Sequence, residues 1–198
     1  MAITTEQIKA LRDKTGVSVM QCKKALEEGG GDEEKALVIL RKKSGEIASK
    51  KSDRALGAGV VSAYIHADST VGSIVELSCE TDFVANNEDF KKLAYDIAMH
   101  VTATNPEFLT TEDISEDDKK KAREVFAKEV SEMDKPENIK EGIVEKKLES
   151  YFSEKVLLTQ PFIKQGDITI KGLIEVAIQK FGEKVELSRF TRFSISGK

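Results

Sequence analysis

The sequence predicts an α+β protein in which a small three-helix unit precedes a core with a three-stranded antiparallel sheet and a helical hairpin. Capping residues delimit short helices in about the first 45 residues. In the next segment apolar residues recur at every second position, and in later segments they recur at steps of three and four residues. The predicted domains are residues 1–52, a helical head with its linker, and residues 53–198, the core, with the helical hairpin at about residues 113–152.

Composition excludes several classes of protein. The chain of 198 residues is 33% charged with a net charge of −4, so it lacks the cationic excess that direct nucleic-acid binding needs. No apolar run is long enough to cross a membrane, and the start, MAITTEQIKALRDKTG, lacks the apolar segment of a signal peptide. We therefore expect no membrane association and a cytoplasmic location. Cys22 and Cys79 form no CxxC pair, so two buried thiols are expected.

The head is predicted from capping signals and a small apolar set. The helix starts and ends are marked by Thr4 with Gln7, Gly16, Ser18 with Gln21, glycines 29–31 and Asp32. The residues expected to form its core are Ile8, Leu11, Leu26, Leu37 and Leu40. We expect the third helix to end near Lys43, and residues 46–58 to form a linker that is partly helical.

A β-hairpin is predicted next, with one side facing the core. The apolar sides of its two strands are Val61, Ala63 and Ile65, then Val75, Leu77 and Cys79. A helix capped near Asn87 and apolar through Val101 should lie across this hairpin.

Two heavily charged helices follow, over residues 115–133 and 139–152, and a tight turn near Asp134 and Pro136 should pair them. In VLLTQPFI, Pro161 favours an edge strand or an extended loop. A helix at residues 173–181 and a final strand, KVELSRFTRFSIS, complete the predicted fold.

The residues suited to catalysis are few. Cys79 with His66 or His100 could form a thiol nucleophile and its base, although a cysteine on an apolar strand face is more often part of the core. Glu80 and Asp82 could bind a metal, although surface acids are far commoner. Phosphate-binding glycine loops are lacking. We therefore expect no catalytic residue, metal or cofactor, and a protein that works by binding others rather than as an enzyme.

Three stretches resemble a known family. LRDKTGVSVMQCKKALEE, ETDFVANNEDF and LLTQPFI, in this order, are similar to signatures of the translation elongation factor Ts family, the guanine-nucleotide exchange factors of elongation factor Tu. AMHVTATNPEFL and FTRFSISG also resemble it, so the likeness covers nearly the whole chain. The resemblance implies a ubiquitin-associated-like head, a dimerisation core and a coiled-coil hairpin. It also implies release of GDP in translation elongation without covalent chemistry, and displacement of the factor when GTP binds.

The resemblance assigns partner contacts to one stretch above all. Thr81, Asp82, Phe83 and Val84 match the part that enters the G domain of elongation factor Tu and dislodges its Mg²⁺, with Asp82 and Phe83 in direct contact. From the residues alone, Phe83 could instead pack into its own core. Asp82 could equally form an Asx turn into the next helix.

Two further contacts are implied with the same partner. Val19, Met20 and Lys23 share a helix face by their spacing, and this face resembles the family's contact with the G domain. The alternative is a core methionine beside a solvated lysine. His100 also matches a family contact position, and its alternative is a histidine on a helix surface.

Longer members of the family carry two versions of the core sheet module, whereas this chain has one. The resemblance therefore implies a homodimer that can bind two partner molecules through an isologous interface. Two other hypotheses stay open at this point. The head could capture an unrelated peptide or a ubiquitin-like fold, or Cys79 could serve a thiol hydrolase.

Overall fold

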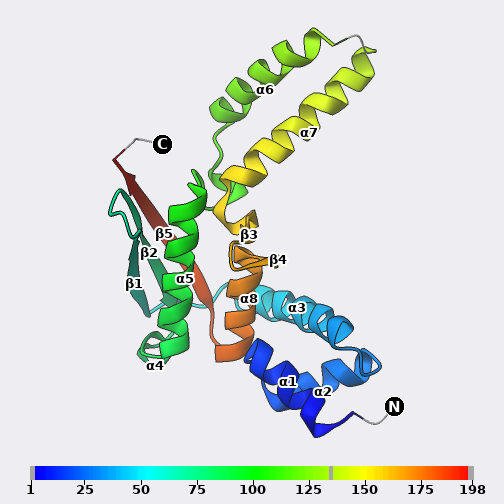
Figure 1. Cartoon of the computed structure of the whole chain (residues 1–198), viewed down its shortest axis with the longest axis vertical. Helices are drawn as coiled ribbons and strands as arrows, with labels where there is room; N and C mark the ends of the chain where they lie inside the picture. The colour runs from blue at the N-terminus through cyan, green and yellow to red at the C-terminus, as the bar shows by residue number, and fades with distance from the viewer. Residues whose placement is uncertain (1–2, 134–135, 196–198) are drawn as a thin grey trace.

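A computed structural model describes residues 3–133 and 136–195 and has the predicted α+β architecture (Figure 1). The head consists of α1 (Thr5–Thr15), α2 (Val19–Glu28) and α3 (Glu33–Lys50). A sheet covered by helices forms the core, and a helical hairpin projects from the core at the end opposite α1 and α2 (Figure 1).

Helix α1 begins and ends where the capping residues predict. Gln7 donates its backbone N–H to Thr4 Oγ1 at 3.2 Å, and Thr4 N–H donates to Gln7 Oε1 at 3.0 Å. Gly16 ends α1 with φ of +68°, a left-handed conformation that glycine adopts without strain. The buried head core is made of Leu11, Val17, Cys22, Ala25, Leu26, Ala36 and Leu40.

The third helix is longer than the sequence indicates. We expected it to end near Lys43, but α3 continues through Gly45 to Lys50, and this expectation is wrong. The second half of α3 packs on α8 (Ile170–Phe181), where Ile47 and Ala48 join the main core. Because this packing stabilises the extra turns, one helix belongs to the head at its start and to the core at its end.

The core sheet has the strand order β1-β2-β5, and both pairs are antiparallel. Its strands are β1 (Ala58–Ile65), β2 (Val71–Cys79) and β5 (Val185–Ser194). Helix α5 (Glu88–Thr104), capped by Asn87 as predicted, packs on β1 and β2, while α8 packs on β5. Val75, Leu77 and Cys79 are fully buried beneath these helices, which confirms the core side of the second strand.

The apolar side of the first strand faces away from the core. Val61 and Ile65 are exposed, whereas Val60 and Tyr64 pack against the buried cluster. Side chains of a strand alternate between its two faces, but β1 carries apolar residues on both faces, so the alternation does not show which face is buried. In the described part of the chain, helices cover one face of the sheet, and Val61, Ala63 and Ile65 lie on the other face. Our expectation that these three residues form the core side is therefore wrong.

The helical hairpin is confirmed as α6 (Glu116–Ser131) and α7 (Glu137–Lys155). Ala122, Val130, Val144 and Leu148 form its buried seam. The 3₁₀ turn η1 (Thr111–Asp113) precedes it. The turn expected near Asp134 lies in part outside the described residues.

Four short elements refine the remaining predictions. The VLLTQPFI stretch folds as a 3₁₀ turn, η2 (Leu157–Thr159), and a short strand, β3 (Pro161–Phe162). This strand pairs with β4 (Gln165–Thr169) in a second sheet that the sequence did not reveal. A one-turn helix, α4 (Asp82–Ala85), joins β2 to α5. Over the described ranges, no helix combines the length and apolar character that spanning a membrane requires.

His100 joins α5 to the segment around β3. Its side chain is fully buried. The Nε2 atom donates a hydrogen bond to Gln160 Oε1 at 2.8 Å, and Nδ1 accepts the N–H of Ile163 at 3.3 Å. A neutral imidazole supplies this one donor and one acceptor. Burial lowers the pKa of His100 from its ordinary value, against the opposing effect of the Gln160 hydrogen bond. The alternative of a surface histidine is wrong.

This burial predicts a loss of stability in mild acid. The unfolded chain takes up a proton near pH 6.5, whereas folded His100 stays neutral to lower pH, so stability falls as the pH drops below 6.5. The slope reaches at most about 1.4 kcal/mol per pH unit from this group. Urea unfolding between pH 7 and 5 should show a shallower pH dependence in His100→Gln than in the parent. Equal slopes would contradict the assignment.

Candidate functional site

Helix α4 holds Phe83 out in solvent. Phe83 is 83% exposed, while the next two residues, Val84 and Ala85, are buried in the main core. Successive helical residues point about 100° apart, so burying Val84 and Ala85 turns Phe83 away from the protein. The alternative in which Phe83 packs into its own core is wrong.

The residues around Phe83 fix the turn. Thr81 is extended, with φ of −130° and ψ of 157°, and its backbone and hydroxyl are both hydrogen-bonded to Glu183. Asp82 is exposed as the first residue of α4, and Asn86 Nδ2 donates to its carbonyl at 2.9 Å. Asn87, not Asp82, caps α5. Asp82 and Phe83 are thus the exposed residues of α4, and Thr81 and Val84 hold them in place.

The head presents a second exposed patch. Met20 is 64% exposed, and Val19 and Lys23 are also exposed, while Cys22 is buried on the opposite side of α2. A core methionine is therefore excluded for Met20. The Nζ atom of Lys23 is 3.8 Å from the carboxylate of Glu27, a long ion pair at an exposed site. Figure 1 shows α2 and α4 at the same end of the molecule, with the C-terminal end of α8 between them.

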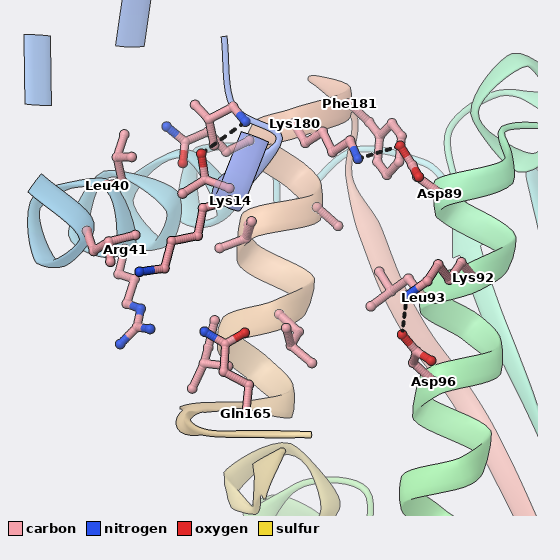
Figure 2. Close-up of a pocket in the computed structure, with 18 residues that line it drawn as sticks. Lys14, Leu40, Arg41, Asp89, Lys92, Leu93, Asp96, Gln165, Lys180 and Phe181 are labelled. Atoms are coloured by element: carbon pink, nitrogen blue, oxygen red, sulfur yellow. Dashed lines mark hydrogen bonds and ion pairs between the residues drawn. The ribbon is translucent and has the colours of Figure 1, made fainter. Parts of the chain in front are cut away.

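A cavity of about 310 Å³ marks the joint between head and core (Figure 2). Lys180 of α8 crosses its edge, and Nζ donates to Asp89 Oδ2 at 2.7 Å in the first turn of α5. The aliphatic part of Lys180 lies against Gly16, where a Cβ atom would come within 3.2 Å of it. One side chain therefore touches both the head and the helix that follows α4.

The outer face of the sheet is apolar and uncovered in the described chain. Its exposed apolar residues are Val61, Ile65, Ile74 and Phe193. Gly72 lies between Ile65 and Phe193 in the strand register, which leaves a hollow across β2. Arg189 pairs with Glu76 at 2.6 Å beside this patch. Sequence reasoning missed this surface because it assigned the wrong side of β1 to the core.

A thiol nucleophile is not assembled. The Cys79 thiol donates to the Thr81 carbonyl at 3.2 Å, and burial raises its pKa, with a further contribution from the Glu183 carboxylate. Both candidate bases have other partners: His66 contacts the Tyr64 hydroxyl, and His100 is bound as described above. A raised pKa and no base leave the thiol protonated, which suits a structural residue.

The carboxylates of this region serve structure. Glu80 accepts the N–H of Lys184 at 2.5 Å and two contacts from Arg54 at 3.2 Å. The hydrogen bond from the Lys184 N–H has the largest effect and lowers the pKa of Glu80. Burial opposes it, and Arg54 lowers the pKa further. In residues 3–133 and 136–195, no group of three His, Cys, Asp or Glu side chains is placed to hold a metal.

Truncating Phe90 and Phe83 should have very different effects on the free energy of unfolding. Phe90 is 0% exposed, so Phe90→Ala should lower the free energy of unfolding by about 3–5 kcal/mol through loss of burial and formation of a cavity. Phe83→Ala should change it by less than about 0.5 kcal/mol. Urea denaturation of both variants measures this. A large loss in Phe83→Ala would show that its ring packs on its own fold.

Comparison with known proteins places the chain in a family. The sequence profile described as Elongation factor TS matches residues 3–198. The chain is 47% identical to Elongation factor Ts of Thermodesulfovibrio yellowstonii, over 98% of this chain and 97% of the relative. It is 46% identical to that of Carboxydothermus hydrogenoformans, over 98% and 89%, and 44% identical to that of Herpetosiphon aurantiacus, over 98% of each. This protein therefore belongs to the elongation factor Ts family.

Proposed function

We propose that this protein promotes the release of GDP from elongation factor Tu by inserting Asp82 and Phe83 beside the Mg²⁺ of the partner's G domain. Membership of the family supports a role in nucleotide exchange during translation elongation, with the cytoplasm as the place of action. The observation that supports the insertion is the 83% exposure of Phe83 on a helix whose next residues are anchored in the core.

The physical basis is competition for the phosphate site. GDP is bound tightly because its phosphates share a Mg²⁺ ion and a loop of backbone amides, so a wedge that shifts the adjoining elements weakens both contacts. Binding of factor and nucleotide is reciprocal. A factor that binds nucleotide-free partner best loosens GDP by the same free energy, and GTP in turn displaces the factor. No covalent step is needed, so the protein acts as a binding factor and not as a hydrolase.

One ring is not sufficient for a large effect. Burying a phenylalanine contributes about 1.5–3 kcal/mol, roughly a tenfold to hundredfold change in an equilibrium constant. The exposed patch of α2 is the second contact in this proposal. Val19 and Met20 would pack on the G domain, with methionine adapting to an irregular surface. Lys23, whose ion pair with Glu27 is long, would donate to a carboxylate or carbonyl of the partner.

Three residues of the family's contact stretches have an indirect role in this proposal: exposed Thr81 and buried Val84 and His100. Thr81 and Val84 orient α4, and His100 fixes α5 to the β3 segment from inside the fold. A contact between His100 and the partner stays a prediction, and it requires that this part of α5 be uncovered.

We further propose that two copies pair through the outer face of the sheet. The patch of Val61, Ile65, Ile74 and Phe193 lies on the sheet face opposite α5, and exposed apolar patches of this kind mark interaction sites. Two such faces can stack as a sandwich about a two-fold axis, each supplying the same residues. Charge is compatible with this, because Glu76 and Arg189 neutralise each other within one face.

Exchange is tested with fluorescent GDP bound to elongation factor Tu. In stopped-flow measurements, Phe83→Ala should reduce the acceleration of GDP release by about tenfold to a hundredfold, since it removes the buried ring from the complex. Val125→Ala, which truncates an exposed residue on α6, away from both patches, should leave the rate unchanged. Normal exchange by Phe83→Ala, with binding lost only in a Met20 variant, would favour a head that captures another protein.

Dimerisation is tested by placing a charge in the sheet face. Ile74→Glu on the central strand should convert the dimer to a monomer, because a carboxylate would be buried without a partner. Val125→Glu, on the exposed side of α6, should leave the dimer intact. Sedimentation equilibrium measures both. A parent chain that is monomeric and still accelerates GDP release contradicts the pairing.

A further inference from the structure

Two carboxylates extend the β2–β5 pair beyond its last backbone partners, Cys79 and Val185. In the same register the next opposite positions are residues 80 and 184, then 81 and 183. Glu80 accepts the N–H of Lys184 at 2.5 Å, and Glu183 accepts the N–H of Thr81 at 3.0 Å. Side-chain oxygens thus replace the backbone carbonyls of a normal antiparallel ladder immediately before α4.

Glu183 binds Thr81 with both oxygens. Oε2 accepts the N–H, and Oε1 accepts the hydroxyl at 2.6 Å. Thr81 stands at the N-cap position of α4, where a threonine hydroxyl commonly bonds to its own helix, yet it makes no such bond here. The hydroxyl is instead committed to Glu183. Hydrogen bonds to an ionised carboxylate are roughly twice as strong as neutral ones.

This attachment lies two residues before Phe83. The exposed ring is placed by the backbone on either side of it, because little of its own surface touches the protein. Val84 and Ala85 secure the far side in the core, and Glu183 secures the near side at Thr81. Arg54 steadies the second carboxylate, Glu80.

We propose that Glu183 is a positioning residue that holds α4 so that Phe83 projects in the orientation the partner accepts. This inference rests on the proposed function and adds a residue to it. A wedge that is already ordered loses less conformational entropy on binding, so more of its contact energy is available to displace the nucleotide.

The orientation is measured without the partner. The chain contains no tryptophan, so Phe83→Trp introduces a single tryptophan at the tip of α4, which can be excited selectively over the three tyrosines. Time-resolved anisotropy should show larger nanosecond motion when Glu183→Ala is added, because alanine leaves the N–H and the hydroxyl of Thr81 without their carboxylate acceptor. The matched control is Glu186→Ala, which removes the same charged side chain from β5, where the Glu186 carboxylate pairs with the Lys184 side chain at 3.1 Å. It should leave the motion unchanged.

Exchange is measured in parallel on chains that retain Phe83. Glu183→Ala should reduce the acceleration of GDP release roughly tenfold, the scale of ordering one backbone residue on binding. Thr81→Val should cause a similar loss. Because both act through one contact, the double variant should lose no more than either single variant. Circular dichroism and thermal unfolding establish that each variant is folded.

The two arms separate the possible failures. Unchanged anisotropy in Glu183→Ala overturns the positioning role, whatever the exchange rate. Additive losses in the double variant also overturn it, because they place the two residues in separate functions. If the parent chain itself fails to accelerate GDP release, the proposed function fails, and the anisotropy still decides whether Glu183 orients residue 83.

Discussion

Burial of Val84 and Ala85 directly beside an exposed Phe83 is the contact on which the rest of this account depends. Two small apolar side chains in the core fix one turn of helix, and that turn directs the largest side chain of α4 into water. Exposing a phenylalanine forgoes about 1.5–3 kcal/mol that its burial would give. The free protein therefore keeps an unused apolar contact that a partner can supply.

The surrounding fold makes this exposure possible. The three-stranded sheet, covered on one face by α5, provides a rigid strand end from which α4 projects. Helix α8 ends between α4 and the head, and its Lys180 contacts the head at Gly16 and α5 at Asp89. The two exposed patches are therefore carried on one connected framework. The α6–α7 hairpin points away from both of them (Figure 1).

Local signals in the sequence were sufficient for most elements. Thr4 and Asn87 mark helix starts because capping is a bond within a few residues, and the spacing of α5 shows its buried side directly. The exposure of Met20 and Phe83 is confirmed, but their selection came from resemblance to a family and not from periodicity. The helical spacing of α5 places Phe90 on its buried side, whereas α4 has only four residues, too few for a spacing that would show whether Phe83 is exposed.

What the sequence could not provide depends on contacts between distant segments. The end of α3 is set by packing on α8, and the outward side of β1 by the helices that cover the opposite face. The bond between Glu183 and Thr81 spans about half the chain and follows only from the register of β2 with β5. These features become visible once the strand pairing is known, because pairing places residue 183 opposite residue 81.

The most direct test of the central claim is a structure of this protein bound to nucleotide-free elongation factor Tu. The account predicts that the Phe83 ring is buried in the G domain next to the vacated metal and phosphate site, with Val84 still in its own core. A complex that releases GDP while Phe83 remains in solvent, or is folded back into its own chain, would contradict it.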